Sequence, residues 1–137
     1  MAEAIGIVAA ALQFASIGNT ILTSISKLKG FSDKSKRLQS QVNQLLALTA
    51  AIRSRLPNDA SDTLSQQLES VITDCIAQGR QMTQLLDNVA ASPKDSTPSK
   101  KLKTVLGVLK EKQFEEICDH LERHKTFLSL YIANSNG

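Results

Sequence analysis

Apolar side chains recur every three or four residues along the first part of the chain, which carries no charged side chain between Ala4 and Ser26. This spacing is typical of a helix, and the apolar stripe is broad enough to cover more than one helix face. Lys27 and Lys29, followed by Gly30, form a typical helix end. The pattern predicts a hydrophobic N-terminal helix with the apolar positions Ile5, Val8, Leu12, Phe14, Ala15, Ile17, Ile21, Ile25 and Leu28.

A second stretch repeats the helical spacing with polar residues between the apolar ones. It runs from Ser32 or Asp33, both of which are good capping residues, to Leu56. Pro57 follows and predicts a turn. Thr49 occupies one position of the stripe at which an apolar residue is expected, so we expect Thr49 to face the core.

A third helical stretch runs from near Ser61 to near Ala90. Gly79 lies in the middle of its apolar stripe, where glycine lowers helix stability by about 1 kcal/mol relative to alanine but permits close helix contact. Pro, Ser and Lys dominate residues Ser92 to Lys101, which predicts a mobile basic loop.

The last stretch has helical spacing from Leu102 to Leu109 and again from Phe114 to Tyr131. The pattern leaves open whether one helix continues through residues 110–112. No useful length of the chain alternates with period two, so strands are not expected. Four long helices joined by short loops predict an all-α fold, an antiparallel four-helix bundle with a hydrophobic N-terminal helix.

The composition predicts an aliphatic core and a single domain. The 137 residues are 42% hydrophobic but only 4% aromatic, with no tryptophan, and we expect residues 1–137 to form one domain. The last residues read like the start of a linker, so we expect the N-terminal domain of a longer protein. Cys75 and Cys118 fall at apolar helix positions, which favours reduced core cysteines in a cytosolic protein.

The uncharged N-terminal run is long enough to span hydrocarbon, which takes about 20 residues. Its strongly apolar residues favour insertion by roughly 3 to 5 kcal/mol. Gln13, Asn19 and several hydroxyl residues oppose insertion by about 0.5–2 kcal/mol each. The two contributions nearly cancel. We therefore expect this helix to rest in the bundle core and to enter a membrane only when several copies assemble.

Basic residues gather in two clusters, although the net charge is only +3. One interpretation is that the clusters are solvated helix ends and a basic loop. The other is that they attract anionic phospholipid, with a binding free energy of about 1 kcal/mol per cation. Nucleic acid is not expected, because aromatic residues do not interleave with the lysines. The first cluster comprises Lys27, Lys29, Lys34, Lys36 and Arg37, and the second comprises Lys94, Lys100, Lys101, Lys103, Lys110 and Lys112.

His120 and His124 lie four residues apart, one turn after Glu116, on one helix face. Two histidines at this spacing bind zinc when a third ligand and a base stand nearby. The sequence is H-L-E-R-H rather than H-E-x-x-H, and Arg123 and Lys125 would repel a cation. No metal site is therefore expected.

Sequence motifs for catalysis are also missing. Cys118 and His120 lie two residues apart, so they point in different directions on a helix. The chain has no GxxxxGK[ST] loop, no GxGxxG and no nucleophile elbow. We expect neither an enzyme nor a cofactor.

Two blocks of the sequence resemble a known family. MAEAIGIVAAALQFASIG resembles the start of fungal N-terminal domains, HeLo-like or SesA-type, that are found on NACHT- or ankyrin-bearing STAND proteins, the fungal counterparts of NOD-like receptors. KLKTVLGVLKEKQFEEICDHLERHKTFL resembles their last helix. Many such domains carry a tryptophan near Thr104 and Val105, and this chain has none.

The resemblance implies a bundle related to death-inducing helical domains of mixed-lineage-kinase-like pseudokinases and plant immune receptors. Such domains are held by the receptor part of the chain, oligomerise on activation and move from the cytoplasm to the plasma membrane. There the N-terminal helix enters the lipid. By this resemblance Glu3 would lie at the mouth of a pore, and the inserting residues would be Ile5, Ile7, Val8, Leu12, Phe14 and Ile17.

The sequence thus leads to a cell-death or heterokaryon-incompatibility-type effector that permeabilises membranes after self-oligomerisation. Anionic membrane lipids would be its partners on activation, with Lys27, Lys29, Lys34, Lys36, Arg37, Lys100, Lys101 and Lys103 at the headgroups. The alternative is a soluble helical module for homotypic interaction, without membrane activity. Under that alternative Leu12→Glu is expected to impair folding.

Overall fold

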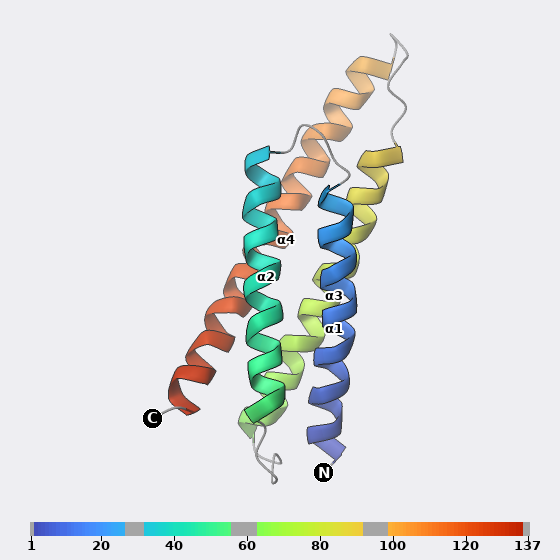
Figure 1. The fold of residues 1–137 in the computed structure, drawn as a ribbon. Coiled ribbons are helices and arrows are strands. Elements are labelled where there is room, and N and C mark those ends of the chain that lie inside the picture. The colour runs from blue at the N-terminus through green and yellow to red at the C-terminus, as the bar shows by residue number, and fades with distance from the viewer. Residues whose placement is uncertain (1, 27–31, 56–62, 92–98, 136–137) are drawn as a thin grey trace.

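The computed structural model describes residues 2–26, 32–55, 63–91 and 99–135, and places the side chains of residues 6–26, 33–54, 66–88 and 110–134. Within these ranges the chain forms four helices and no strand: α1 Ala2–Ser26, α2 Ser32–Arg55, α3 Thr63–Ala91 and α4 Ser99–Ser135. Consecutive helices run in opposite directions (Figure 1). The predicted all-α antiparallel bundle is confirmed.

The helix bounds follow the hydrophobic spacing closely. The last stretch is one helix that continues through residues 110–112. The predicted loop from Ser92 to Lys101 is wrong at its end, because Ser99, Lys100 and Lys101 already belong to α4. The good helix formers Lys100, Lys101, Leu102 and Lys103 follow Ser99, so the helix begins directly after Pro98. The rest of this predicted loop, Gly30 and Pro57 lie outside the described residues.

Each helix packs mainly against two others. α1 contacts α3 most extensively and then α2, whereas α4 contacts α2 and α3. Lys34 in the first turns of α2 pairs with Glu111, so the part of α4 that precedes Glu111 extends beyond the start of α2 (Figure 1). α1 and α4 therefore each lie against both α2 and α3, on opposite sides of the bundle.

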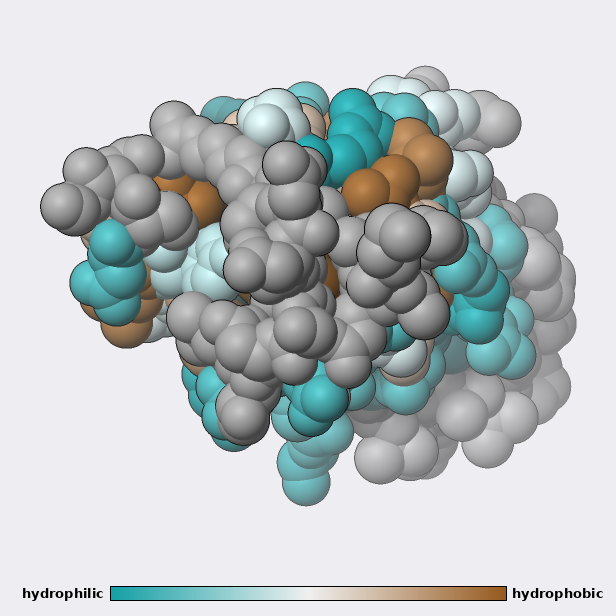
Figure 2. Space-filling model, turned by 90° about the horizontal axis from the view of Figure 1, so that it is seen from below, coloured by the Kyte–Doolittle hydropathy of each residue, from teal (hydrophilic) through white to brown (hydrophobic). Residues whose placement is uncertain are grey.

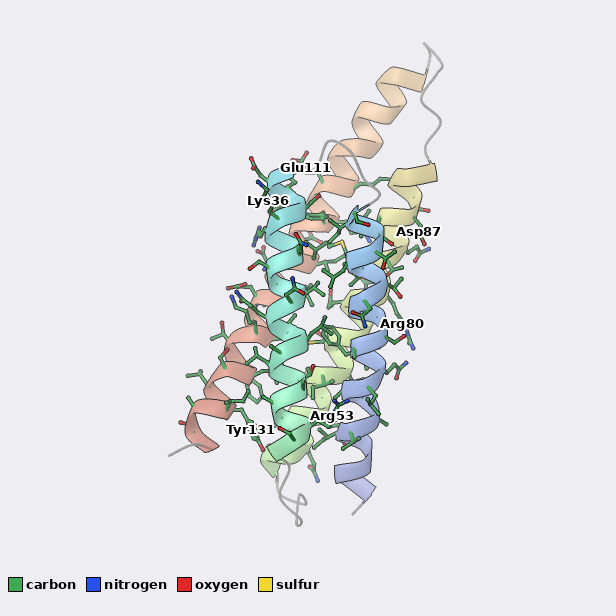
Figure 3. All side chains as sticks on the ribbon, in the orientation of Figure 1. Lys36, Arg53, Arg80, Asp87, Glu111 and Tyr131 are labelled. Atoms are coloured by element: carbon green, nitrogen blue, oxygen red, sulfur yellow. The ribbon has the colours of Figure 1, made fainter. Side chains whose placement is uncertain are left out.

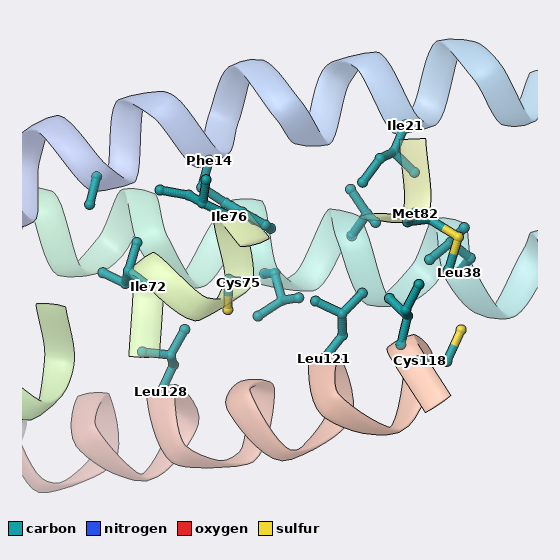
Figure 4. Close-up of a cluster of buried hydrophobic side chains, with 14 of the residues drawn as sticks. Phe14, Ile21, Leu38, Ile72, Cys75, Ile76, Met82, Cys118, Leu121 and Leu128 are labelled. Carbon is teal, nitrogen blue, oxygen red and sulfur yellow. The ribbon is translucent and has the colours of Figure 1, made fainter. Parts of the chain in front are cut away.

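The core is a continuous, mainly aliphatic cluster to which all four helices contribute (Figure 4). Thr49 is 2% exposed and Gly79 is buried, as their positions in the stripes predict. Both cysteines are buried free thiols. The largest fully buried side chains are Phe14, Ile7, Ile21, Leu38, Leu45, Ile52, Leu68, Ile72, Met82, Ile117, Leu121 and Leu128.

The orientation of α1 corrects the expected position of one residue. Phe14 is fully buried, whereas Leu12 is 51% exposed. Residues two positions apart on a helix are separated by about 200° of rotation around its axis. A helix that directs Phe14 into the core therefore directs Leu12 to the solvent. The expected place of Leu12 in the buried stripe is wrong, and Leu12→Glu is therefore not expected to impair folding.

Glycines let α1 approach its neighbours closely. A Cβ atom added at Gly79 of α3 would lie 2.6 Å from Ile17 Cγ2 of α1. A Cβ atom added at Gly18 of α1 would lie 2.8 Å from Leu46 Cδ2 of α2. Real Cβ contacts are longer than this, so α1 lies against α2 and α3 at distances that larger residues would prevent.

Candidate functional site

Within residues 6–26, whose side chains the structure describes, α1 has a buried apolar face and an exposed face without a charged side chain. Ile7, Phe14, Ile21 and Ile25 point into the core. A helix on the surface of a soluble bundle normally carries charged residues on its solvent side. Between residues 6 and 26 of α1 the exposed residues are instead Ala9, Leu12, Gln13, Ser16, Asn19, Thr20, Thr23 and Ser26.

Hydroxyl groups on this exposed face bind the carbonyl oxygens of their own helix. Thr20 Oγ1 donates to the Ser16 carbonyl at 3.0 Å, and Thr23 Oγ1 donates to the Asn19 carbonyl at 2.9 Å. Ser26 Oγ donates to the Thr23 carbonyl at 2.7 Å. A hydroxyl that is bonded inside its own helix loses less free energy on leaving water than one without a partner. Thr20, Thr23 and Ser26 thus each have a hydrogen-bond partner that they would keep on leaving water.

The apolar part of α1 has the length of a membrane span. Gly6–Ser26 has a mean hydropathy of 1.4 over 21 residues, which corresponds to about 32 Å of helix against about 30 Å of bilayer hydrocarbon. Only 33% of the most apolar window is buried. The core helix of a soluble protein meets the same length and composition criteria.

The residues predicted to insert do not form one surface in this structure. Ile7 and Phe14 are 0% exposed, and Ile17 packs partly buried against the core. Val8 is half-buried and Leu12 is exposed. The structure places Ile5 and Glu3 on the backbone of α1, and their side chains lie outside the described set. Insertion of all these residues into lipid therefore requires α1 to leave the bundle.

Two of the predicted headgroup residues form ion pairs between α2 and α4. Lys34 pairs with Glu111 of α4. Arg37 donates a hydrogen bond from Nη1 to Glu115 Oε2 at 2.8 Å and another from Nη2 to Asp119 Oδ1 at 3.3 Å. We call this row of α2 cations and α4 carboxylates the ionic seam.

The other predicted headgroup residues are less completely placed. Lys36 is exposed at the end of the bundle where α2 begins, the same end as Glu111 (Figure 3). Lys27 and Lys29 lie outside the described residues. Lys100, Lys101 and Lys103 lie on the first turns of α4, and their side chains are not among those described.

A buried glutamine continues the ionic seam toward the middle of the bundle. Gln41 is 4% exposed, and its Nε2 atom donates to the Cys118 carbonyl at 3.1 Å and to Glu122 Oε2 at 3.0 Å. Its Oε1 atom has no hydrogen-bond partner among the described residues. Hydrogen bonds from Lys125 and then from Gln41 lower the pKa of Glu122. The seam therefore joins exposed ion pairs to a buried amide.

Both cysteines are buried, and His124 contacts a carboxylate. Burial raises the pKa of the Cys75 thiol to about 12 and that of Cys118 to about 11, which suppresses the nucleophilic thiolate. His124 Nε2 lies 2.5 Å from Asp74 Oδ2 and joins α4 to α3. In the described part of the chain no three His, Cys, Asp or Glu side chains are grouped to hold a metal ion.

Sequence reasoning missed the ionic seam, although its spacing was visible. Lys34 and Arg37 are three residues apart, and the partners Glu111, Glu115 and Asp119 recur every four residues. Such spacing places each set on one helix face. It does not tell which two helices meet or at what register.

A comparison with protein families decides the identity of this bundle. The model of the SesA family, described as an N-terminal domain on NACHT NTPases and P-loop NTPases, matches residues 5–126. The chain is a SesA domain. The SesA match covers most of α1, all of α2 and α3 and most of α4, and it confirms the resemblance found in the sequence. No curated protein and no solved structure matches the chain.

Membership of the SesA family assigns an effector or signalling role to the domain. The family lies on the N-terminal side of NACHT NTPases, which agrees with the expected association with a NACHT portion of the same chain. For this SesA domain, the uncharged face of α1 and the ionic seam are the two features that membership alone does not explain.

Proposed function

We propose that this SesA domain is a cell-death or heterokaryon-incompatibility-type effector that oligomerises and permeabilises membranes through α1. Release of the domain by its NACHT-bearing receptor would start the process in the cytoplasm and carry the domain to the plasma membrane. The observation that carries the proposal is the uncharged exposed face of α1, whose hydroxyl groups bind helix carbonyls.

The free energy of moving α1 supports this proposal. Ile7 and Phe14 leave the protein core but enter hydrocarbon of similar polarity, so their hydrophobic stabilisation is largely kept. What is lost is close packing, for example between Ile17 and Gly79. What opposes insertion is the desolvation of Gln13 and Asn19. Neighbouring copies can reduce this last contribution when their polar faces pair or line water, which explains why assembly would precede insertion.

Leakage of dye from vesicles tests the proposal directly. The chain is fused to an inducible oligomerisation domain and added to vesicles that contain phosphatidylserine. Oligomerised protein is expected to release the dye, whereas the same protein without inducer releases little. Absence of leakage by oligomerised wild-type protein would overturn the permeabilising function.

A matched pair of surface variants assigns the activity to α1. Leu12→Glu places a carboxylate within the span and opposes insertion by roughly 2–3 kcal/mol, while leaving an exposed position in the bundle. Ala47→Glu places the same charge on the exposed face of α2. We expect Leu12→Glu to abolish leakage and Ala47→Glu to retain it. Equal leakage by both variants would exclude α1 as the inserting element.

The second candidate function is a soluble module for homotypic interaction. The close packing of α1 against Gly79 and the complete burial of Phe14 favour a bundle that stays folded. Under this function the oligomerised protein remains in the aqueous fraction with anionic vesicles and releases no dye. Sedimentation of the vesicles after the leakage assay therefore separates the two functions.

A further inference from the structure

The ion pairs of the ionic seam are accessible to solvent and exchangeable. The side chains of Lys34 and Arg37 are 31% and 44% exposed, and those of Glu115 and Asp119 are 42% and 62% exposed. Ion pairs in such positions are individually weak and are screened by salt. A partner with a high density of negative charge can therefore compete for the same cations.

The partners of Arg37 have the chemistry of phosphate oxygens. A guanidinium group presents its donors as a planar fork that fits carboxylate and phosphate equally well. Arg37 uses this fork on two carboxylates of α4, one on Glu115 and one on Asp119. The α4 carboxylates occupy the donors that an anionic headgroup would need.

We infer that the α4 carboxylates in the ionic seam are an internal substitute for anionic phospholipid headgroups, so that docking on an anionic bilayer separates α4 from α2. This inference rests on the proposed function, because it takes the membrane as the target of the domain. Phospholipid is favoured over other polyanions because α1 of the same molecule carries an uncharged exposed face of membrane-spanning length.

The buried end of the seam favours such an opening. Gln41 Oε1 has no partner among the described residues and is removed from water. A buried acceptor without a hydrogen bond destabilises the closed state, and separation of α4 from α2 hydrates it. The same separation breaks the hydrogen bond between Gln41 and the Cys118 carbonyl and uncovers the region around Cys118.

Binding to vesicles tests whether the α4 carboxylates take the place of lipid headgroups. Glu115→Gln with Asp119→Asn removes the partners of Arg37 and keeps the shapes of both side chains. Binding to vesicles with phosphatidylserine is expected to tighten about fivefold for each cation that is released. The two substitutions are expected to have no effect on binding to vesicles of phosphatidylcholine alone. They are also expected to have no effect on binding of inorganic phosphate at the same phosphorus concentration.

The matched control removes the same charge elsewhere. Glu116→Gln with Asp87→Asn changes exposed acids on α4 and α3 and raises the net charge by the same amount. Equal tightening by the control pair would overturn the inference, because general charge would then explain the gain. Adding Arg37→Gln to the first pair is expected to remove the gain. Should the first pair unfold in circular dichroism, Asp119→Asn alone is measured against Glu116→Gln with the same criterion.

Alkylation of Cys118 tests the opening itself on the wild-type chain. Maleimide labelling is followed by mass spectrometry of the peptide that contains Cys118, with and without phosphatidylserine vesicles. The buried thiol is expected to react slowly in solution and at least about tenfold faster on the vesicles. Unchanged labelling on bound protein would overturn the opening.

The results separate this inference from the proposed function. The Leu12→Glu chain is expected to bind the vesicles and to expose Cys118 without releasing dye. If wild-type protein leaks but the Glu115 and Asp119 pair binds like its control, the inference fails and the proposed function stands. If the variant of Glu115 and Asp119 binds more tightly but no protein releases dye, the proposed function fails. The binding of headgroups by the cations of the ionic seam then stands.

Discussion

Gly79 of α3 lies directly against Ile17 of α1, and a Cβ atom at Gly79 would stand 2.6 Å from Ile17 Cγ2. The contact joins the two helices that pack most extensively in the bundle. Because the Ile17 Cγ2 methyl is attached directly to Cβ, it cannot swing away as the tip of a long side chain would. The position of α1 therefore depends on the missing side chain at residue 79.

Gly79→Ala is expected to destabilise the bundle. Overpacking at a close contact costs about 1–3 kcal/mol, and the better helix propensity of alanine returns about 1 kcal/mol. We expect a net loss of about 1 kcal/mol or more in the free energy of unfolding, measured with urea. If the proposed function holds, the variant also releases dye at a lower concentration of inducer, because α1 is held less tightly.

Gly6→Ala is the control for this prediction. Its added Cβ atom would meet the carboxylate of Glu69, the far end of a flexible side chain. Glu69 can move away, so the variant is expected to be as stable as wild type or more stable, by up to about 1 kcal/mol. Equal destabilisation by both variants would contradict the prediction, because the contact with Ile17 would then not decide the effect.

Phe14 and Leu12 lie on opposite sides of α1 and are expected to respond differently to substitution. Phe14→Ala leaves a cavity at a position with no exposure and should lower the free energy of unfolding by about 3–5 kcal/mol. Leu12→Glu changes an exposed residue for another good helix former and should change it by no more than about 0.5 kcal/mol. Thermal and urea unfolding measure both. A large loss for Leu12→Glu would mean that Leu12 is covered in solution.

The buried thiols predict a loss of stability at alkaline pH. Burial raises the pKa of Cys75 from 9.0 to about 12 and that of Cys118 from 9.0 to about 11. Above pH 9 the unfolded chain loses these protons while the folded chain keeps them, so unfolding becomes easier. Each thiol contributes a slope of up to about 1.4 kcal/mol per pH unit between pH 9 and its folded pKa, and nothing below pH 9.

Urea unfolding between pH 8 and pH 11 measures this slope. The lysines also titrate in this range, so the informative quantity is the difference between wild type and Cys75→Ala. The variant is expected to be less stable at pH 8, because it loses a buried side chain, but to lose less stability per pH unit above pH 9. Parallel curves for the two proteins would contradict the prediction.

The helices and much of the core follow from local spacing in the sequence. Thr49 and Gly79 could be assigned to the buried stripes because each occupies a position fixed by its own helix. The inward face of α1 could not be assigned in the same way. Both Leu12 and Phe14 belong to apolar rows of that helix, and the neighbouring helices decide which row is covered.

The ionic seam shows a second limit. Lys34 and its partner Glu111 are 77 residues apart in the chain, so their meeting depends on the pairing and register of α2 and α4. The sequence contained both charged rows but not the register that brings them together. Lys34 and Arg37 were therefore predicted as headgroup residues without the carboxylates that occupy them in the folded bundle.

Glu122 predicts a loss of stability at acidic pH that involves the inner end of the seam. Lys125 Nζ lies 2.8 Å from Glu122 Oε1, and Gln41 Nε2 donates to Oε2 at 3.0 Å. These partners lower the pKa of Glu122 below 4.5 in the folded protein. The stabilisation is complete above pH 4.5 and disappears as the pH falls through the folded pKa, because the unfolded chain takes up the proton first.

Glu122→Gln should lose less stability than wild type between pH 6 and pH 3 in urea unfolding, whereas Glu116→Gln should follow wild type. The same pH dependence in Glu122→Gln and wild type would mean that Glu122 does not contribute to the seam.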